Sequence, residues 1–298
     1  MTKLVNPLSN EETLHAYMRA LREAYDQPAI NHPNFGRQQW LDIPYSNKSE
    51  RQKFNVYLPG GTGPFPAIVW VHGGGWYTGD RSDRWLDSML PFIENGFALI
   101  SVGYRLADEA VFPNPVEDVV CAVEQIYQTG AQYNIDTKRI GVVGGSAGAN
   151  IAAHAALRCQ CLKAALLLCP PLNFAAYQKQ FAQSGIIREG SSMPEEDTSY
   201  EAMYLGGSIL RLPEKAKGAD PANHLLGHIP PFLLIHGTAD AVVPYQQSVV
   251  FHQAVVDTAG DETRAALILI EDGDHDAPAL ELDELMESKL GFFQKYLK

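Results

Sequence analysis

A single serine stands among small residues in GVVGGSAGAN, residues 141–150. A hydrophobic run precedes it and the helix-forming run ANIAAHAAL follows, so Ser146 is predicted at a tight turn between a strand and a helix. Such a turn needs glycine because the backbone passes close to its neighbours, and Gly144 and Gly148 flank the serine. The helix dipole there favours a developing negative charge. The pattern indicates a nucleophile at Ser146, and a glycine-rich turn without chemistry is the alternative.

A serine hydroxyl needs a base to accept its proton and a carboxylate to orient that base. The segments PFLLIHGTAD and AALILIEDGDH each begin as a hydrophobic strand and end on a polar residue, Asp240 in the first and His275 in the second. Because open α/β sheets place their sites at the carboxyl ends of the strands, we predict that both side chains lie beside Ser146. His275 is then the base and Asp240 the acid.

Other histidines and acids are weaker candidates. His72 belongs to a glycine-rich segment, where we expect it to brace the loop, and His236 lies inside a strand, where we expect a hydrogen-bonded core histidine. Three carboxylates next to the predicted base, Asp272, Asp274 and Asp276, are rival acids. Side chains so near in sequence do not readily reach the same ring nitrogen, so we predict that they form a solvated loop.

The segment VHGGGW, residues 71–76, ends an earlier strand. Successive glycines let backbone N–H groups turn toward a ligand, as stabilisation of an oxyanion requires. A loose glycine-rich loop is the alternative. No Lys-Ser or Lys-Thr pair follows the glycines, which argues against a phosphate-binding loop.

The sequence predicts no metal and no cofactor. DGDHD, residues 272–276, begins like a calcium loop, but Ala277 stands where the sixth position needs glycine and Asp283 where the twelfth needs glutamate. Cysteines 121, 159, 161 and 169 match no zinc spacing, and no G-x-G-x-x-G dinucleotide motif is present. We expect the cysteines to be buried free thiols, which favours a cytoplasmic protein.

Composition narrows the classes of partner. The formal net charge is −12 and no Lys- or Arg-rich run occurs, so binding to nucleic acid or to an anionic membrane is not expected. The N-terminus lacks the apolar stretch of a secretory signal, and the hydrophobic runs are shorter than a membrane span. We expect a small-molecule substrate, and a homodimer remains open.

Short apolar runs alternate with helical segments, which is typical of a mostly parallel sheet with helices on both faces. We predict one α/β domain over residues 1–298 with about eight strands. Residues 173–228 are too long for a simple connection and, with the helical segment 1–40, are candidates for a small lid. The predicted strands are 38–46, 53–59, 66–74, 97–105, 139–146, 163–171, 231–240 and 265–275, and the predicted helices are 9–27, 82–95, 115–129, 147–158, 244–259 and 280–297.

Several of these segments together resemble the α/β-hydrolase esterases over roughly residues 50–298. HGGGW and YRLADEAVFPNPVEDV are similar to the hormone-sensitive-lipase-like branch, whereas HGTADAVVP and DPANHL look more like bacterial acetyl-xylan and feruloyl esterases. RIGVVGGSAGANIAAHAAL and the final GDHD complete the likeness, in the chain order serine, acid, histidine.

This resemblance implies an α/β-hydrolase fold and a serine carboxylesterase. Ser146, His275 and Asp240 would be its catalytic triad, and Gly74, Gly75 and Ala147 its oxyanion hole. Short-chain acyl, acetyl or feruloyl esters, including acylated sugars, would be the substrates. An aryl formamidase with the same triad and a non-catalytic small-molecule receptor are the alternatives. The residues that we expect to line the substrate pocket are Trp76, Tyr77, Tyr200 and Tyr204.

Overall fold

The hydrophobic runs of the sequence form one sheet of eight strands in the computed structural model, which describes residues 35–279 and 283–298. The strand order is β1-β2-β4-β3-β5-β6-β7-β8. β2 pairs antiparallel with β1 and β4, and all other neighbours are parallel. The prediction of a mostly parallel sheet of about eight strands is confirmed. The strands are β1 (Gln38–Pro44), β2 (Lys53–Leu58), β3 (Phe65–Val71), β4 (Ala98–Val102), β5 (Ile135–Gly145), β6 (Leu162–Leu168), β7 (Phe232–Gly237) and β8 (Ala265–Ile270).

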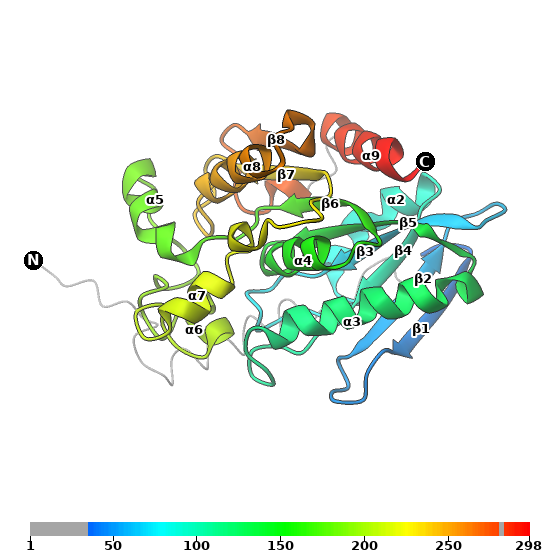
Figure 1. Cartoon of the computed structure of the whole chain (residues 1–298), viewed down its shortest axis with the longest axis horizontal. Helices are drawn as coiled ribbons and strands as arrows, with labels where there is room; N and C mark the ends of the chain where they lie inside the picture. Colours follow the sequence, from blue (N-terminus) through cyan, green and yellow to red (C-terminus); the bar gives the residue numbers. More distant parts are fainter. Residues whose placement is uncertain (1–34, 280–282) are drawn as a thin grey trace, which may run out of the picture.

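Helices cover both faces of the sheet (Figure 1). Alternate residues of a strand point to opposite faces, and in the fully buried β3 this places Val69 in one core cluster and Ile68 in the other. The first face is covered by α3 (Asn114–Thr129), α4 (Ala147–Arg158) and α8 (Gln246–Ala259), and the second by the 3-10 helix η3 (Arg84–Met89), α2 (Leu90–Glu94) and α9 (Asp283–Leu297). Burial on both faces explains why the parallel strands are almost continuously apolar.

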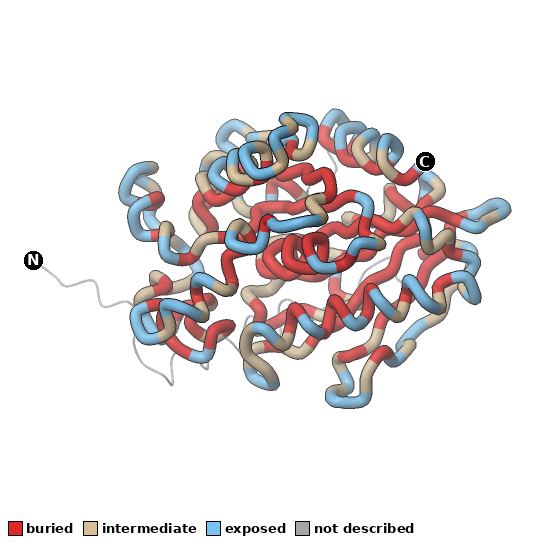
Figure 2. The backbone as a smooth tube through the Cα atoms, viewed as in Figure 1, coloured by how far each residue is buried: buried red, intermediate tan, exposed pale blue. Residues whose placement is uncertain are grey.

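The helix after the predicted nucleophile, α4, is buried along almost its whole length (Figure 2). Every residue of α4 from Ala147 to Leu157 is buried. Its alanines and glycine leave little side-chain volume, so the helix packs closely on the sheet. That close packing fixes the start of α4, where Ser146 lies, relative to the strand ends.

The segment between β6 and β7 contains five short helices. They are η5 (Phe174–Ala176), α5 (Tyr177–Ser184), α6 (Tyr200–Leu205), α7 (Pro213–Gly218) and η6 (Pro221–His224). Of these, α5, α6 and α7 lie at one end of the molecule (Figure 1). Asn150 of α4 links the start of this segment to its later part, because its side-chain amide donates to the carbonyls of Pro171 and Ala219, each at 3.0 Å. We call residues 173–228 the roof segment. Movement of this segment as a lid stays a prediction.

The remaining elements differ from prediction in their bounds. The helix predicted over 82–95 is split into η3, which Asp83 caps, and α2, which has Pro91 in its first turn. Strand β5 begins four residues earlier than predicted, where Ile135 pairs with Phe65. The short 3-10 helices η4 (Gly130–Tyr133), η7 (Glu262–Arg264) and η8 (Ala277–Ala279) complete the chain. The predicted helix 9–27 and most of segment 1–40 lie outside the described residues.

None of the helices in residues 35–279 and 283–298 combines the length and the apolar composition that a membrane crossing requires.

Candidate active site

Ser146 sits at the sharp turn that joins β5 to α4. Its backbone is left-handed, with φ 50° and ψ −123°, which is strained for a residue with a side chain. The flanking glycines make the turn possible: a Cβ on Gly148 would lie 2.2 Å from the Val71 carbonyl oxygen, and one on Gly144 would lie 2.4 Å from that of Gly148. A hydrogen bond of 2.8 Å from the Ser146 N–H to the Leu168 carbonyl holds the turn against β6. The structure thus has the strand–turn–helix that the sequence predicted.

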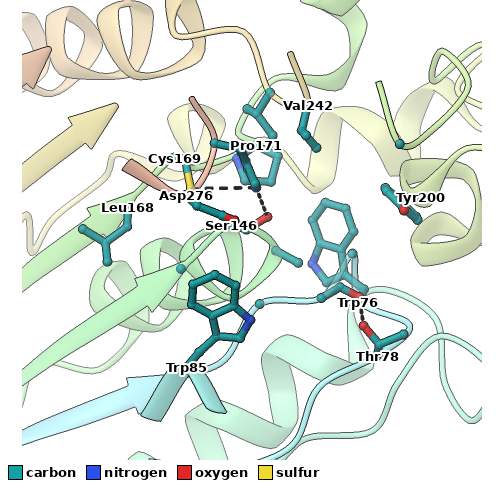
Figure 3. A pocket seen from close by; sticks show the side chains of 18 of the residues that line it. Trp76, Thr78, Trp85, Ser146, Leu168, Cys169, Pro171, Tyr200, Val242 and Asp276 are labelled. Carbon is teal, nitrogen blue, oxygen red and sulfur yellow. Dashed lines mark hydrogen bonds between the residues drawn. The ribbon is translucent and has the colours of Figure 1, made fainter. Parts of the chain in front are cut away.

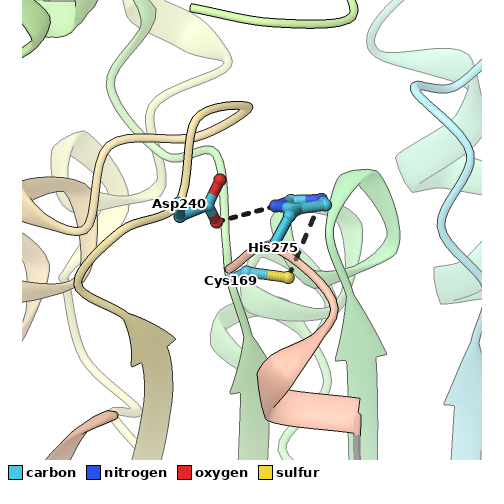
Figure 4. A group of neighbouring side chains, drawn as sticks. All are labelled: Cys169, Asp240 and His275. Atoms are coloured by element: carbon cyan, nitrogen blue, oxygen red, sulfur yellow. Dashed lines mark hydrogen bonds and ion pairs between the residues drawn. The ribbon is translucent and has the colours of Figure 1, made fainter. Parts of the chain in front are cut away.

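The structure brings Ser146, Asp240 and His275 together at the carboxyl ends of β5, β7 and β8. His275 Nε2 lies 3.0 Å from Ser146 Oγ. On the other side of the ring, His275 Nδ1 lies 2.7 Å from Asp240 Oδ2, the contact drawn in Figure 4. Both distances are those of hydrogen bonds. The imidazole therefore bridges the hydroxyl and the carboxylate in the geometry that nucleophilic catalysis by serine requires.

Among the hydrogen bonds of the described residues, none of the three rival acids, Asp272, Asp274 and Asp276, contacts His275 Nδ1. Asp274 accepts hydrogen bonds from the N–H groups of Asp276 and Ala277 and so shapes the loop that carries His275. Asp272 and Asp274 are at least partly exposed to solvent, as expected for an acidic loop. The hydrogen bond to His275 Nδ1 comes from Asp240, on the loop after β7.

Charge and burial act against each other in the buried pair. Burial by itself would raise the pKa of Asp240, but the charges and hydrogen bonds of His275 and His236 lower it well below the usual range of an aspartate. Burial by itself would lower the pKa of His275, but the Cys169 sulfur and the Asp240 carboxylate raise it above its ordinary value. Asp240 is therefore ionised at neutral pH and stabilises a proton on the imidazole.

A cavity of about 160 Å³ opens beside Ser146 (Figure 3). Its walls are mostly aromatic and aliphatic, with few polar groups, as is typical of a small-molecule site. Besides the residues of the turn and of the glycine-rich loop, the lining includes Trp70, Trp76, Trp85, Leu168, Cys169, Pro171, Arg188, Tyr200, Glu201, Val242, Val243, His275 and Ala279. The arrangement can hold a small, largely apolar group against the serine hydroxyl.

The glycine-rich loop lies on the opposite side of Ser146 from β6. Gly74 and Gly75 have φ of 99° and 58°, conformations that glycine adopts without strain, and both line the cavity beside Ala147. Within the part of the chain that the structure describes, the N–H groups of these three residues donate to no other residue. Three backbone donors at the wall of the cavity, next to the hydroxyl, can stabilise negative charge there.

His72 supports this loop, as predicted. Its ring is completely buried and stacks on Tyr104 at a centroid distance of 4.3 Å, and burial lowers the pKa of His72 to about 4. Nδ1 lies 2.9 Å from the Gly73 carbonyl, and the Tyr104 hydroxyl donates to the His72 carbonyl at 2.8 Å. Both contacts fix the backbone from which the glycines follow.

Of the four aromatic residues predicted to line the pocket, Trp76 and Tyr200 do so and Tyr77 and Tyr204 do not. Tyr204 is fully buried behind Trp76, on which it stacks at 4.4 Å, and its hydroxyl donates to Asn150. It supports the wall rather than forming it. Tyr77 lies in the turn closed by the hydrogen bond from Thr78 to Gly74, where consecutive side chains leave in different directions.

Sequence reasoning missed a buried ion pair in the lining. Arg188 Nη2 lies 2.7 Å from Glu201 Oε1, and the two side chains are 3% and 2% exposed. Burial opposes the charge of Arg188, but Glu201 and Tyr177 raise its pKa above the ordinary value, and its guanidinium lies over the Tyr177 ring at 4.8 Å. Both charged residues belong to the roof segment, whose sequence has no periodicity from which their burial could be predicted. Trp70 and Trp85 were also missed, although Trp70 directly precedes the glycine-rich loop.

One group of side chains could present three metal ligands. Cys169, Asp240 and His275 offer ligand atoms within 4.8 Å of one another (Figure 4). However, His275 Nδ1 is engaged by Asp240 and Nε2 by Ser146, and a ligating histidine must offer a free lone pair. A metal ion would have to displace the serine, so the arrangement suits proton transfer better than metal binding. All four cysteines are free, and Cys159 and Cys169 are buried as expected, whereas Cys161 is half-buried and Cys121 is exposed.

The sheet order and the strand–turn–helix of Ser146 define this chain as an α/β-hydrolase. The family model BD-FAE matches residues 54–255, and the chain belongs to that family. The match spans the strand–turn–helix of Ser146 and the loop of Asp240.

Curated relatives and solved structures agree with this assignment. Esterase LipQ of Mycobacterium tuberculosis (strain ATCC 25618 / H37Rv) is 25% identical over 236 residues, which are 74% of this chain and 53% of LipQ. Neutral cholesterol ester hydrolase 1 of Bos taurus is 35% identical over 91 residues, 29% of this chain and 22% of that protein. The chain thus spans about half the length of LipQ and a smaller share of the cholesterol ester hydrolase.

Among solved structures, a truncated carbohydrate esterase from gut microbiota has a TM-score of 0.76 at 24% identity, covering 91% of this chain and 99% of that one. Esterase B from Lactobacillus rhamnosis has a TM-score of 0.72 at 20% identity, covering 95% and 94%. At these identities the likeness establishes the fold.

Proposed function

We propose that this protein is a serine carboxylic ester hydrolase with Ser146 as nucleophile, His275 as general base and acid, and Asp240 as the orienting carboxylate. The observation that carries the proposal is the placement of the His275 ring, 3.0 Å from Ser146 Oγ and 2.7 Å from Asp240 Oδ2. Membership of the BD-FAE family and relatives named as esterases support it.

The reaction proceeds by acyl transfer in two halves. Ser146 Oγ attacks the ester carbonyl while His275 Nε2 takes its proton, and His275 then gives that proton to the departing alcohol. A water molecule, deprotonated by the same nitrogen, attacks the acyl-enzyme. The bond between the acyl carbon and Ser146 Oγ then breaks, His275 returns the proton to Oγ, and the acid is released. Asp240 stays ionised throughout and stabilises the imidazolium that forms in each half.

The negative oxygen of each tetrahedral intermediate is stabilised by backbone donors. We assign this role to the N–H groups of Gly74, Gly75 and Ala147, because all three residues line the cavity and none donates elsewhere among the described residues. Loss of one such donor typically lowers the rate by about 100- to 1000-fold.

The substrates that we propose are short-chain acyl, acetyl or feruloyl esters, including acylated sugars. A cavity of about 160 Å³ with tryptophan walls supports a small acyl group or one flat aromatic ring beside Ser146. The structural likeness to a carbohydrate esterase is the reason for including acylated sugars.

We propose a cytoplasmic location and a possible homodimer as well. Four free cysteines, one of them exposed, support a reducing compartment. Light scattering of the purified protein measures the oligomeric state.

A substrate panel tests the proposed function. Wild type and Ser146→Ala are assayed on acetyl, butyryl, octanoyl and feruloyl esters and on one aryl formamide, with Ser288→Ala on the exposed face of α9 as the matched control. We expect ester turnover in wild type and in Ser288→Ala, and none in Ser146→Ala. A preference for the formamide would make the protein an amidase, and full activity of Ser146→Ala would exclude Ser146 as nucleophile. No turnover by wild type would favour a receptor.

A further inference from the structure

A second histidine touches the orienting carboxylate from the side away from the serine. His236, in β7, is completely buried. Its Nε2 lies 3.1 Å from Asp240 Oδ2 and 3.0 Å from the Val243 carbonyl, and its Nδ1 lies 2.8 Å from Ser248 Oγ in α8. The sequence predicted a hydrogen-bonded core histidine at this position but not its contact with Asp240.

The surroundings of the ring fix where its proton lies. Nε2 faces two groups that can only accept, the ionised Asp240 carboxylate and the Val243 carbonyl, so Nε2 must carry a hydrogen. Ser248 Oγ, 2.8 Å from Nδ1, completes the hydrogen-bond contacts of the ring. His236 is therefore a donor toward Asp240.

The contact completes a set of four donors around one carboxylate. Asp240 Oδ1 accepts from the N–H groups of Val242 and Val243, both at 2.8 Å, while Oδ2 accepts from His275 and His236. The two backbone N–H groups fix Oδ1. His236 fixes Oδ2, the same oxygen that accepts the hydrogen bond from His275. Without His236, the only side-chain donor on Oδ2 among the described residues would be His275, the ring that it has to orient.

We infer that His236 is a positioning residue of this active site, whose Nε2–H holds Asp240 Oδ2 in line with His275 Nδ1. It acts through Asp240: His236 has no contact with Ser146 among its hydrogen bonds and does not itself line the cavity. The inference rests on the proposed function, because it assigns a role within the same proton-transfer chain.

The role depends on the donor rather than on the ring. His236→Leu removes the donor and keeps an apolar group of similar size. His236→Gln also removes the ring but places an amide nitrogen near the position of Nε2, from which it can donate to Asp240. The matched control is His154→Leu in α4: His154 is likewise buried, with Nε2 3.1 Å from the Ala219 carbonyl, but it does not line the cavity.

The test measures kcat and KM on p-nitrophenyl acetate, corrected for the folded fraction by thermal unfolding, together with the rate at which a p-nitrophenyl phosphonate labels Ser146. In metal sites, loss of a hydrogen-bond partner that orients a ligand typically costs about 10- to 100-fold in affinity or activity, and we expect a loss of the same order for a partner that orients Asp240. We expect His236→Leu to lower kcat and the labelling rate by this factor with little change in KM. His236→Gln should recover most of the loss, and His154→Leu should lower stability without lowering kcat.

Two results would overturn the inference while the proposed function stands: an unchanged kcat in His236→Leu, or an equal loss in His236→Leu and His236→Gln. A wild type that neither hydrolyses the ester nor reacts with the phosphonate would overturn the proposed function, and the inference with it.

Discussion

The sulfur of Cys169 lies 3.9 Å from His275 Nε2, the same nitrogen that contacts Ser146 Oγ at 3.0 Å. Cys169 directly follows β6, is 5% exposed and lines the cavity. A thiol and a hydroxyl thus share one imidazole nitrogen. Any group added to the sulfur enters the space in which the proposed proton transfer takes place.

We therefore expect methyl methanethiosulfonate to inactivate the protein slowly, and a reducing thiol to restore activity. Cys169→Ala should retain most activity and resist the reagent, because its side chain is smaller and carries no sulfur. Cys121→Ala, at an exposed position, is the control and should be inactivated like wild type. Inactivation of Cys169→Ala at the wild-type rate would show that another cysteine is responsible.

The carboxylate of Asp240 should matter for kcat more than for binding. In Asp240→Asn the amide cannot stabilise the imidazolium and can favour the wrong tautomer, so we expect kcat to fall by up to about 10⁴-fold with little change in KM. Steady-state kinetics on p-nitrophenyl acetate measure both constants. The matched control is Asp274→Asn, in the neighbouring loop. Similar losses of kcat in both variants would show that Asp240 is not specifically the orienting acid.

The rate should rise with pH on the acid side. The proposed base acts only when it is unprotonated, and contact with the Cys169 sulfur and the Asp240 carboxylate raises the pKa of His275 against the effect of burial. Activity is consequently lost as pH falls through that raised pKa, so we expect the acid limb of kcat/KM above the ordinary pKa of a histidine. A pH profile of wild type measures it, and a limb at or below that value would contradict the prediction.

Gly148 should tolerate no side chain. A Cβ there would lie 2.2 Å from the Val71 carbonyl oxygen and 2.3 Å from that of His72, so α4 would be pushed from the glycine-rich loop. We expect Gly148→Ala to lower the free energy of unfolding by about 1–3 kcal/mol and to abolish activity. Gly291→Ala, in α9 with open space around it, should instead add about 0.5–1 kcal/mol. Denaturant unfolding compares the two, and equal effects would refute the steric argument.

The ion pair of the roof segment should be important for stability. Glu201→Ala leaves the buried Arg188 without its carboxylate, and removal of one partner of a buried pair typically costs about 3–5 kcal/mol. The control is Glu117→Ala at the exposed pair with Arg158, where we expect about 0–1 kcal/mol. Thermal unfolding of both variants checks the difference. Comparable losses would show that burial does not determine how much an ion pair contributes to the free energy of unfolding.

The triad and the sheet could be predicted because their signals are local. Ser146, Asp240 and His275 each follow a hydrophobic strand, and the carboxyl ends of parallel strands meet at one edge of the sheet. The tight turn could be predicted because only glycine fits at positions 144 and 148, where a Cβ would meet backbone atoms.

The cavity wall could be predicted only in part. Tyr200 and Tyr204 are one helical turn apart in α6, yet the first faces the cavity and the second packs behind Trp76. How deeply each of these tyrosines is buried depends on how the roof segment packs on α4. Hydrophobic periodicity in the sequence does not predict that packing. For the same reason Arg188 and Glu201 were not foreseen. His236 shows the reverse case, since burial in a strand was predictable but its partner depended on the path of the loop that follows.

Two hydrogen bonds connect the roof segment to the backbone of the loop that carries Asp240. The Glu189 N–H donates to the Ala241 carbonyl at 2.7 Å, and Arg188 Nε donates to that of Val242 at 3.3 Å. Val242 in turn donates to Asp240 Oδ1. The same contacts therefore connect the cavity lining to the position of Asp240. We expect a substitution at 188–189 that changes substrate preference also to make the position of the Asp240 carboxylate less fixed. We expect substitutions that change substrate preference to be better tolerated at Trp85 or Ala279, which also line the cavity but belong to neither of these two segments.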